Sequence, residues 1–527
     1  MTEYWKNDDF TMIKEKYVPV KIVKYENIEK IDELLKDKPA CVSFMTENCA
    51  KFTGKGSYVL LDFGKEMCGS LRIVCRDAEA PAADFRITFG ESVSEACSSI
   101  GEKNATNDHT PRDFNIKVSM MSDAFYGLTG FRFARVELLS EKPALIKNIF
   151  AVSQLPLIED EGYITTSDEE LNKIIETAAY TLKLNFQNGY IWDGIKRDRL
   201  VWCGDLHQEI LNSVYLYGKN KNVTNSLSFL RDETPDTDWV NGIPTYSAWW
   251  VINLCDYCAL LNDKEYFAKN SDWAKIILER FDKCIAEDGT MDFSENAFME
   301  FFLDWSTYET EEAVTGTAAV IIMAAKSFLK VEENETCRNI IRKLSPYLEK
   351  QSNTKQVRAF QILAGRDAEK ENEFLEKNGA QGFSTFMAYY ILTADALSGG
   401  KQMVPMIKQY FGAMLSRGAT TFWEDFDLNW LENTGRIDEF PKEDQKDIHG
   451  DFGAYCYKGF RHSLCHGWSS GLISFIVEYV IGLKVTDDGV EFNPHAEEVE
   501  NINAVLFTKH GKVNVEIKNG KATYKYI

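Results

Sequence analysis

The chain has 527 residues, of which 44% are hydrophobic and 27% charged, as expected for a globular protein of two or three domains. Its formal net charge of −22 disfavours nucleic acids and anionic membrane surfaces as partners and favours a neutral or cationic ligand. Aromatic residues make up 13% of the chain, enough for a large core and for flat faces that stack on sugar rings, and compatible with a homodimer.

The first seventeen residues, MTEYWKNDDFTMIKEKY, contain no basic start followed by an apolar run, so we expect no signal peptide. No stretch approaches the roughly 18 apolar residues of a membrane span. We therefore expect a cytoplasmic protein whose twelve cysteines are buried thiols in a reducing compartment. Cys255 and Cys258 form one close pair without a second pair at zinc spacing, so neither a metal nor another cofactor is expected.

Residues 1–157 are predicted to form an N-terminal β-sandwich. Apolar and polar residues alternate there over strand-like lengths, turn residues separate the segments, and helical periodicity is poor. The segments that carry this pattern are 57–75, 85–92, 113–121 and 131–139.

Residues 158–482 are predicted to be helical. The first helix opens with a capping box, in which Ser167 is followed three residues later by Glu170. An apolar face follows it. Long helical segments then succeed one another with loops rich in Trp, Asp, Glu and Gly between them, which predicts a toroid of paired helices. These segments are 246–261, 271–285, 313–329, 337–350, 354–365, 384–398, 403–416 and 467–483.

Residues 483–527 are predicted to form a short C-terminal β-domain. The alternating pattern returns on both sides of Asn519-Gly520, which is the signal for a type I′ hairpin. Because fewer than 50 residues remain, these strands are expected to pack on the helices or on the N-terminal strands.

The stretch WDGIKRDRLVWCGD, residues 192–205, crowds charges against large aromatic rings. Its two glycines favour a loop over a helix interior. In such a loop, carboxylates can accept hydrogen bonds from sugar hydroxyls while an indole stacks on the C–H face of the ring. The alternative is an ion-paired connector, in which the arginines only neutralise their neighbours.

Two further clusters lie far along the chain. GATTFWE, residues 418–424, ends in Glu424 after an aromatic pair, and SLCHGWSSG, residues 463–471, places His466 at the start of a helix. Glycoside hydrolysis needs two carboxyl groups on opposite sides of the scissile bond, and Asp198 and Glu424 would be such a pair. Alternatively, His466 is a structural cap or a satisfied core residue.

These three motifs, in this order, resemble those of the α-L-rhamnosidases of glycoside hydrolase family 78. LDFGKEMCGSLRI and FGES are similar to the β-sandwich that precedes the catalytic barrel in that family, and GLKVTDDGVEFNP is similar to the entry of its C-terminal β-domain. The resemblance implies a multidomain α and β protein. An (α/α)6 catalytic barrel would be flanked by one N-terminal β-sandwich and a short C-terminal β-domain, as in a minimal form of the family.

The resemblance also implies metal-independent release of terminal α-L-rhamnose with inversion, from a small glycoside or oligosaccharide. Asp198 would be the general acid and Glu424 the general base. The other residues expected to bind substrate are Asp193, Arg197, Trp202, Asp205, Trp249, Trp250, Trp305 and His466. Many members carry Glu where Asp198 stands. Two other functions stay open: another glycosidase or a lyase on the same toroid, and a sugar-binding protein without catalysis.

Overall fold

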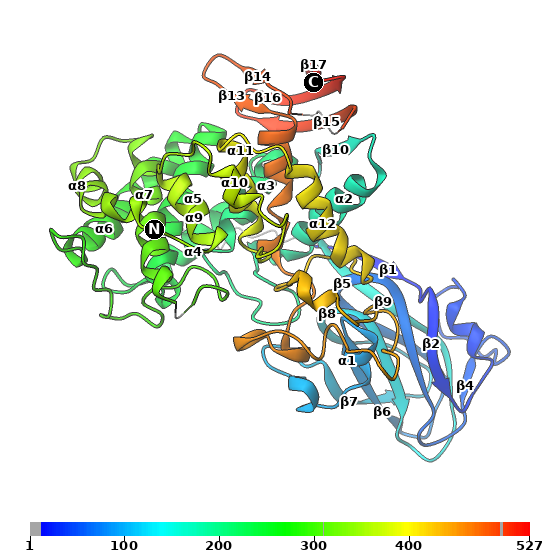
Figure 1. The fold of residues 1–527 in the computed structure, drawn as a ribbon. Coiled ribbons are helices and arrows are strands. Elements are labelled where there is room, and N and C mark those ends of the chain that lie inside the picture. The colour runs from blue at the N-terminus through cyan, green and yellow to red at the C-terminus, as the bar shows by residue number, and fades with distance from the viewer. Residues whose placement is uncertain (1–11, 309, 496–498) are drawn as a thin grey trace.

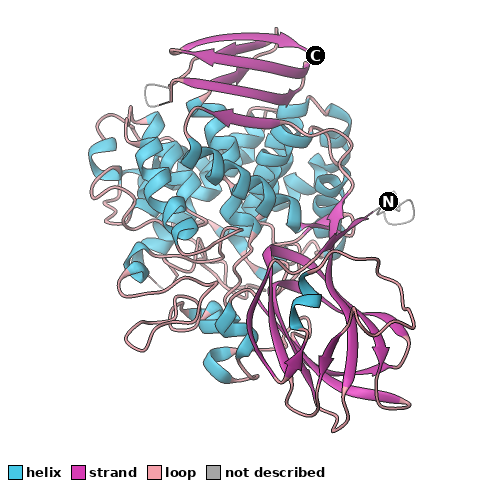
Figure 2. Cartoon of the chain, turned by 90° about the vertical axis from the view of Figure 1, so that its right-hand side faces the viewer, coloured by secondary structure: helices cyan, strands magenta, loops and turns pink. Residues whose placement is uncertain are grey.

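The computed structural model describes residues 12–308, 310–495 and 499–527. A sheet-rich N-terminal part, a central mass of helices and a small C-terminal sheet follow one another along the chain (Figures 1 and 2). The predicted class, a multidomain protein of helices flanked by strands at both ends, is therefore what the structure shows.

The N-terminal part is an antiparallel sheet of nine strands that curls around its own apolar core. The long strands β5 and β8 pair along most of their length, with a break in register between Asp62 and Met67 where Gly64 takes a positive φ of 86°. The break bends β5, so that its two halves contribute to different faces of the core. The strands are β1 (Met12–Tyr17), β2 (Lys21–Glu26), β3 (Ile28–Glu29), β4 (Ala50–Phe52), β5 (Tyr58–Asp77), β6 (Ala82–Gly90), β7 (Asp113–Ser119), β8 (Ser122–Leu138) and β9 (Ala144–Pro156), with the short helix α1 (Val93–Cys97) after β6.

The central helices form a closed ring. α3, α5, α7, α9, α11 and α13 each contact the next in this order, and α13 contacts α3 again. Helices α4, α6, α8, α10 and α12 alternate with them along the chain, and α2 precedes α3, so the order is that of six helix pairs. The helices are α2 (Glu169–Asn185), α3 (Leu206–Tyr217), α4 (Lys221–Glu233), α5 (Pro244–Leu261), α6 (Lys264–Cys284), α7 (Glu311–Leu329), α8 (Glu335–Leu344), α9 (Lys355–Ala364), α10 (Asn372–Leu375), α11 (Ala388–Leu397), α12 (Met403–Ser416) and α13 (Leu472–Phe475).

Burial separates the two sets of helices. α5 and α11 are buried on nearly every side, whereas α6 and α8 bury one stripe and expose the other. This difference is expected for an inner ring covered by outer helices. Among the described residues, α7 is the one helix long and apolar enough to cross a membrane, and most of it is buried inside the protein, as in the core helix of a globular domain.

The first helix begins one residue later than predicted. Asp168, and not Ser167, is the N-cap of α2, and its side chain accepts a hydrogen bond from the Leu171 N–H. The Ser167 hydroxyl instead accepts from the backbone N–H of Asn501, at the C-terminal sheet. Both residues suit an N-cap position, so the local pattern could not distinguish them.

The C-terminal sheet packs on the helices. β15 (Asn501–Thr508), β16 (Gly511–Lys518) and β17 (Lys521–Tyr526) form a meander, and β10 (Tyr163–Thr166), which directly precedes α2, joins it by pairing with β15. β15 also contacts α3. Asn519 and Gly520 both have positive φ, as the predicted type I′ turn requires. Two shorter hairpins are β11 (Phe186–Gln187) with β12 (Tyr190–Ile191), and β13 (Leu483–Val485) with β14 (Val490–Phe492).

Candidate active site

A pocket of about 210 Å³ lies at the N-terminal ends of several inner helices. Its walls come from the segment before α3, the start of α5, the segment before α7 and the loops that precede α13. N-terminal helix ends carry partial positive charge, so this end of the ring suits the carboxylates gathered there. The lining residues are Asp193, Arg197, Asp198, Trp202, Asp205, Ile243, Tyr246, Phe298, Met299, Phe302, Trp305, Glu424, Cys456, Arg461, His466 and Trp468.

The loop between β12 and α3 is closed on itself. The backbone N–H of Asp193 donates to the carbonyl of Leu200 at 2.9 Å, and the Asp193 carboxylate accepts the Leu200 N–H at 2.9 Å. At the tip of this closed loop, Asp198 and Arg199 take left-handed φ values of 57° and 59°. Non-glycine residues adopt this conformation at a cost, and such strain is commonly found at functional sites.

Three polar side chains contact the Asp198 carboxylate, two of them by hydrogen bonds and one as an ion pair. Arg197 Nη1 lies 2.8 Å from its Oδ1, and His109 Nδ1 lies 3.0 Å from the same oxygen. The indole Nε1 of Trp202 donates to Oδ2 at 3.3 Å. Asp198 is thus held at the pocket wall while part of its side chain stays accessible.

Glu424 is the other carboxylate of the pocket, and it is buried. One oxygen is paired with Arg197 Nη2, and the other accepts the backbone N–H of Ser463 at 3.1 Å. Its own carbonyl accepts from Thr385 and from the Trp468 indole, which fixes the backbone. Burial alone would raise the pKa of Glu424, but the positive charge of Arg197, helped by the nearby histidines, lowers that pKa to about 2. Glu424 is therefore ionised at neutral pH.

The buried side chains of Asp193, Asp205 and His466 form the floor of the pocket. His466 lies 3.6 Å from Asp193, 3.8 Å from Asp205 and 3.8 Å from Glu424. Burial raises the pKa of Asp193 to about 6 and that of Asp205 to about 8. Burial opposes the charged form of His466, but its three acidic neighbours outweigh burial and raise its pKa. The floor therefore offers both donors and acceptors to a polar ligand.

Most of the residues predicted from sequence meet at this pocket. The three motifs at residues 192–205, 418–424 and 463–471 contribute Asp193, Arg197, Asp198, Trp202, Asp205, Glu424 and His466, and Trp305 joins them from the segment before α7. The Arg197 side chain links two of these motifs because it binds both Asp198 and Glu424. An ion-paired connector alone would not bring the two remote motifs to the same cavity.

Trp249 and Trp250 lie elsewhere, in the core of the helical ring. The Trp249 ring packs against His207 and Tyr390, and both tryptophans are almost completely buried. Trp250 packs edge-to-face on Trp273, and its indole N–H donates to the Leu227 carbonyl. Neither is among the residues that line the pocket, which corrects the expectation that they contact a sugar. Because α5 is apolar on every side, its sequence did not reveal which ring faces the ligand.

Several lining residues were not among those predicted to bind substrate. Tyr246 donates to Asp205 at 3.3 Å from the first turn of α5, and Trp468 stands two residues after His466. The Phe302 ring packs against Trp305, and both residues lie in FFLDW, so the prediction for Trp305 could have been extended to Phe302. Phe298, which is 74% exposed at the rim, follows no motif and could be found only from the fold.

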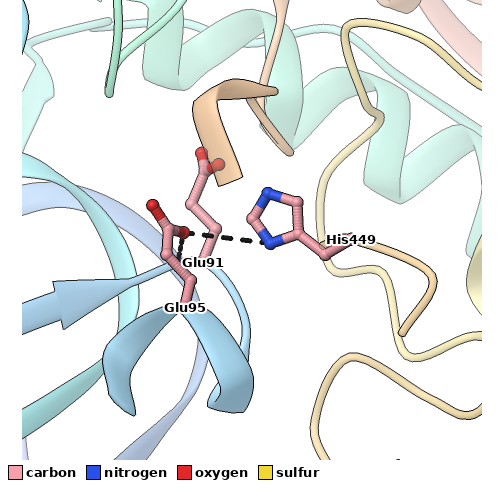
Figure 3. A group of neighbouring side chains, drawn as sticks. All are labelled: Glu91, Glu95 and His449. Carbon is pink, nitrogen blue, oxygen red and sulfur yellow. Dashed lines mark hydrogen bonds and ion pairs between the residues drawn. The ribbon is translucent and has the colours of Figure 1, made fainter. Parts of the chain in front are cut away.

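A second acidic cluster lies beside the pocket. Figure 3 shows Glu91 and Glu95, from the end of β6 and from α1, facing His449. Their ligand atoms lie within 4.8 Å of one another, close enough to hold a metal ion. However, the ammonium of Lys196 already lies 2.8 Å from Glu91 and 3.2 Å from Glu95. A metal would have to displace this cation, so the donor set fits an internal ion-pair network better than a metal centre.

A ring of six helix pairs with a carboxylate-lined pocket at one end defines the class of six-hairpin glycosidase folds. Residues 159–356 match the family described as the bacterial alpha-L-rhamnosidase 6 hairpin glycosidase domain. The match includes the motif with Asp198, while Glu424 and His466 lie beyond it. No curated protein matches the chain.

Solved structures share the fold over nearly the whole chain. A rhamnosidase from Klebsiella oxytoca with rhamnose bound has a TM-score of 0.70 at 19% identity, over 90% of this chain and 98% of that one. The GH78 rhamnosidase of Bacillus sp. GL1 has a TM-score of 0.68 at 17% identity, over 92% of this chain and 52% of that one. The Streptomyces avermitilis α-L-rhamnosidase complexed with L-rhamnose has a TM-score of 0.67 at 15% identity, over 97% of this chain and 48% of that one. The resemblance predicted from the sequence thus agrees with the family match over residues 159–356 and with the fold shared with a GH78 rhamnosidase.

Proposed function

We propose that the protein is an inverting, exo-acting α-L-rhamnosidase that releases terminal α-L-rhamnose from small glycosides. The observation that carries this proposal is the shared guanidinium of Arg197, which binds Asp198 and Glu424 in one pocket. Two carboxyl groups in one cavity are the minimum equipment for glycoside hydrolysis. The family match and the rhamnosidase folds support rhamnose as the sugar.

In this proposal Glu424 is the general base. It is buried and ionised, so it can take a proton from a water molecule that attacks the anomeric carbon. Asp198, nearer the accessible side of the pocket, is the general acid and protonates the departing oxygen. Arg197 lies between the two carboxyl groups and binds each through a different Nη atom, which fixes their positions relative to one another.

The remaining pocket groups would bind the sugar. Asp193, Asp205 and His466 offer hydrogen-bond partners for hydroxyl groups at the floor. The rings of Trp202 and Trp305 offer apolar faces for the C–H side of the sugar and for its methyl group. An enclosed floor with a half-open mouth suits a terminal residue better than the middle of a polysaccharide. Cytoplasmic placement and a homodimer stay predictions from the sequence.

A panel of aryl glycosides tests the assignment. The wild-type chain should release the aryl group from an α-L-rhamnoside and not from the other sugars. Glu424→Gln should still bind rhamnose but lose about 10²–10⁴-fold in kcat, the usual contribution of a general base. Glu432→Gln, at an exposed position in the same segment, is the matched control and should keep full activity.

Other outcomes of the panel point elsewhere. Cleavage of a different sugar with no action on the rhamnoside would favour another glycosidase on this toroid. An unsaturated product that absorbs in the ultraviolet would indicate a lyase. Rhamnose binding by calorimetry without hydrolysis of any glycoside would indicate a sugar-binding protein. Wild-type turnover in Glu424→Gln would refute the role of Glu424 itself.

A further inference from the structure

We propose that His109, in the N-terminal β-domain, is a positioning residue for Asp198, so that the β-domain completes the acid side of the active site. The inference rests on the proposed function, because it takes Asp198 as the general acid. It assigns a role to a residue that belongs to none of the three motifs and lies outside the helical ring.

The contact is direct. His109 Nδ1 lies 3.0 Å from Asp198 Oδ1, and the imidazole is about one-third exposed. His109 has a left-handed φ of 68°, and Asp198 has one of 57°, so both ends of the contact are in a conformation that costs energy for a residue with a side chain. The surrounding structure therefore holds the backbone of both residues in this conformation.

The loop that carries His109 is fixed on each side of it. Asp108 pairs with Arg461, a residue of the pocket wall, at 3.2 Å. The Thr110 hydroxyl donates to the Leu128 carbonyl at 2.9 Å, and Arg199 Nη1, one residue after Asp198, donates to the same carbonyl at 3.1 Å. The loop is therefore tied both to its own sheet and to the strained catalytic loop, and a histidine placed there has little freedom to leave.

A second contact joins the β-domain to the same catalytic loop. The Lys196 ammonium, two residues before Asp198, is buried against Glu91 and Glu95 of the β-domain. It also donates to the carbonyls of Phe460 and His462 in the helical part. Such a network is costly to break because a buried charge would be left without a partner. The β-domain thus holds the loop at Lys196 and, through His109, the acid itself.

His109 differs in kind from the other partners of Asp198. Arg197 and the Trp202 indole can only donate, so they can bind the oxygens of Asp198 but cannot accept the O–H of its protonated form. An imidazole can donate to the carboxylate through a protonated nitrogen or accept the acid proton at an unprotonated one. Arg197 is moreover shared with Glu424. His109 is therefore the partner that can bind Asp198 in either protonation state, because the partly exposed imidazole can exchange its own proton with solvent when Asp198 changes state.

The test compares His109→Leu and His109→Asn with the wild-type chain on two aryl α-L-rhamnosides. One substrate carries an activated leaving group, a dinitrophenolate, which departs without a proton. The other carries an unactivated phenol, which needs the acid. His109→Leu should lower kcat on the phenyl substrate by about tenfold or more, a fraction of what general acid catalysis contributes. On the dinitrophenyl substrate it should stay within about threefold.

The asparagine variant is the conservative replacement. Its side-chain amide can donate through the nitrogen or accept through the oxygen near the position of Nδ1, so His109→Asn should recover most of the phenyl-substrate activity. Rhamnose affinity, measured by calorimetry, should be equal in all three proteins. His109→Phe keeps a ring without a nitrogen and repeats the comparison if the leucine variant does not fold.

Equal losses on both substrates, or no loss on either, would overturn the role of His109. This failure is distinct from failure of the proposed function. If Asp198→Asn kept wild-type activity on the phenyl rhamnoside, or the wild-type chain released no rhamnose, the acid assignment or the activity itself would be wrong, whatever the His109 variants did.

Discussion

Replacing Arg197 by methionine tests the electrostatics on which the base depends. The substitution keeps an unbranched side chain, although a shorter one, and removes its charge. Arg197 is buried and binds both Asp198 and Glu424, so the variant leaves the charge of Glu424 buried without its main partner. Losing one member of a buried ion pair typically costs about 3–5 kcal/mol in the free energy of unfolding.

The lowered pKa of Glu424 gives an independent value for this loss in the free energy of unfolding. A pKa lowered from 4.5 to about 2 corresponds to about 3 kcal/mol, at roughly 1.4 kcal/mol for each unit. Because the folded pKa is the lower one, this stability is present above about pH 4.5 and is lost as the pH falls towards 2. Without Arg197, burial dominates and the pKa of Glu424 should rise above 4.5, so the variant should be least stable, relative to wild type, at neutral pH.

Two assays follow these changes. Denaturant unfolding of wild type and Arg197→Met at pH 7 and at pH 5 should show a deficit that is larger at pH 7. The acidic limb of the kcat/KM profile should move to higher pH, because the base must be ionised to act. Arg436→Met is the control: Arg436 is itself exposed and its partner Asp438 keeps Arg132 as a second cation, so the loss should be about 1 kcal/mol or less. An Arg197→Met protein as stable as this control, with an unmoved acidic limb, would refute the reasoning.

Two further substitutions test the floor and the core. Asp205, whose pKa is raised by burial to about 8, holds a proton in the folded state that the unfolded chain releases near pH 4, so wild type should lose stability as the pH rises from 4 to 8. In denaturant unfolding at several pH values, Asp205→Asn should not show this loss of stability. The same pH dependence in both proteins would contradict the prediction. Trp250→Ala should cost about 3–5 kcal/mol in unfolding free energy by leaving a cavity, yet the folded variant should bind rhamnose with wild-type affinity in calorimetry. Weaker binding by a variant that remains folded would place Trp250 at the sugar after all.

The architecture was readable from sequence because its signals are local. Strand alternation, helical periodicity and the Asn519-Gly520 turn each depend on a few adjacent residues. The capping error at Ser167 has a local origin too, because a second good cap, Asp168, stands beside it. The pairing of β10 with the C-terminal sheet joins segments more than three hundred residues apart, so no local sequence pattern predicts it.

The site was predicted where its residues lie in motifs and missed where they do not. Asp198 and Glu424 stand in charge-and-tryptophan clusters that are unusual for a core or a surface. His109 stands in an ordinary loop of the β-domain and reaches Asp198 only because the two domains pack together, and Phe298 stands in an ordinary loop of the helical domain. Trp249 was misplaced for the opposite reason: it lies in a helix with no polar face, so periodicity could not orient its ring.

The most direct test of the roles of Asp198 and Glu424 is to identify the first anomer of the sugar that is released. Proton NMR of an aryl α-L-rhamnoside mixed with the protein reports the first anomer of rhamnose before it equilibrates. If Asp198 and Glu424 act on opposite sides of the bond with a water beside Glu424, the β-anomer must appear first. An α-anomer formed first would mean that the second carboxylate attacks the sugar itself, and an uncleaved rhamnoside would contradict the assigned chemistry altogether.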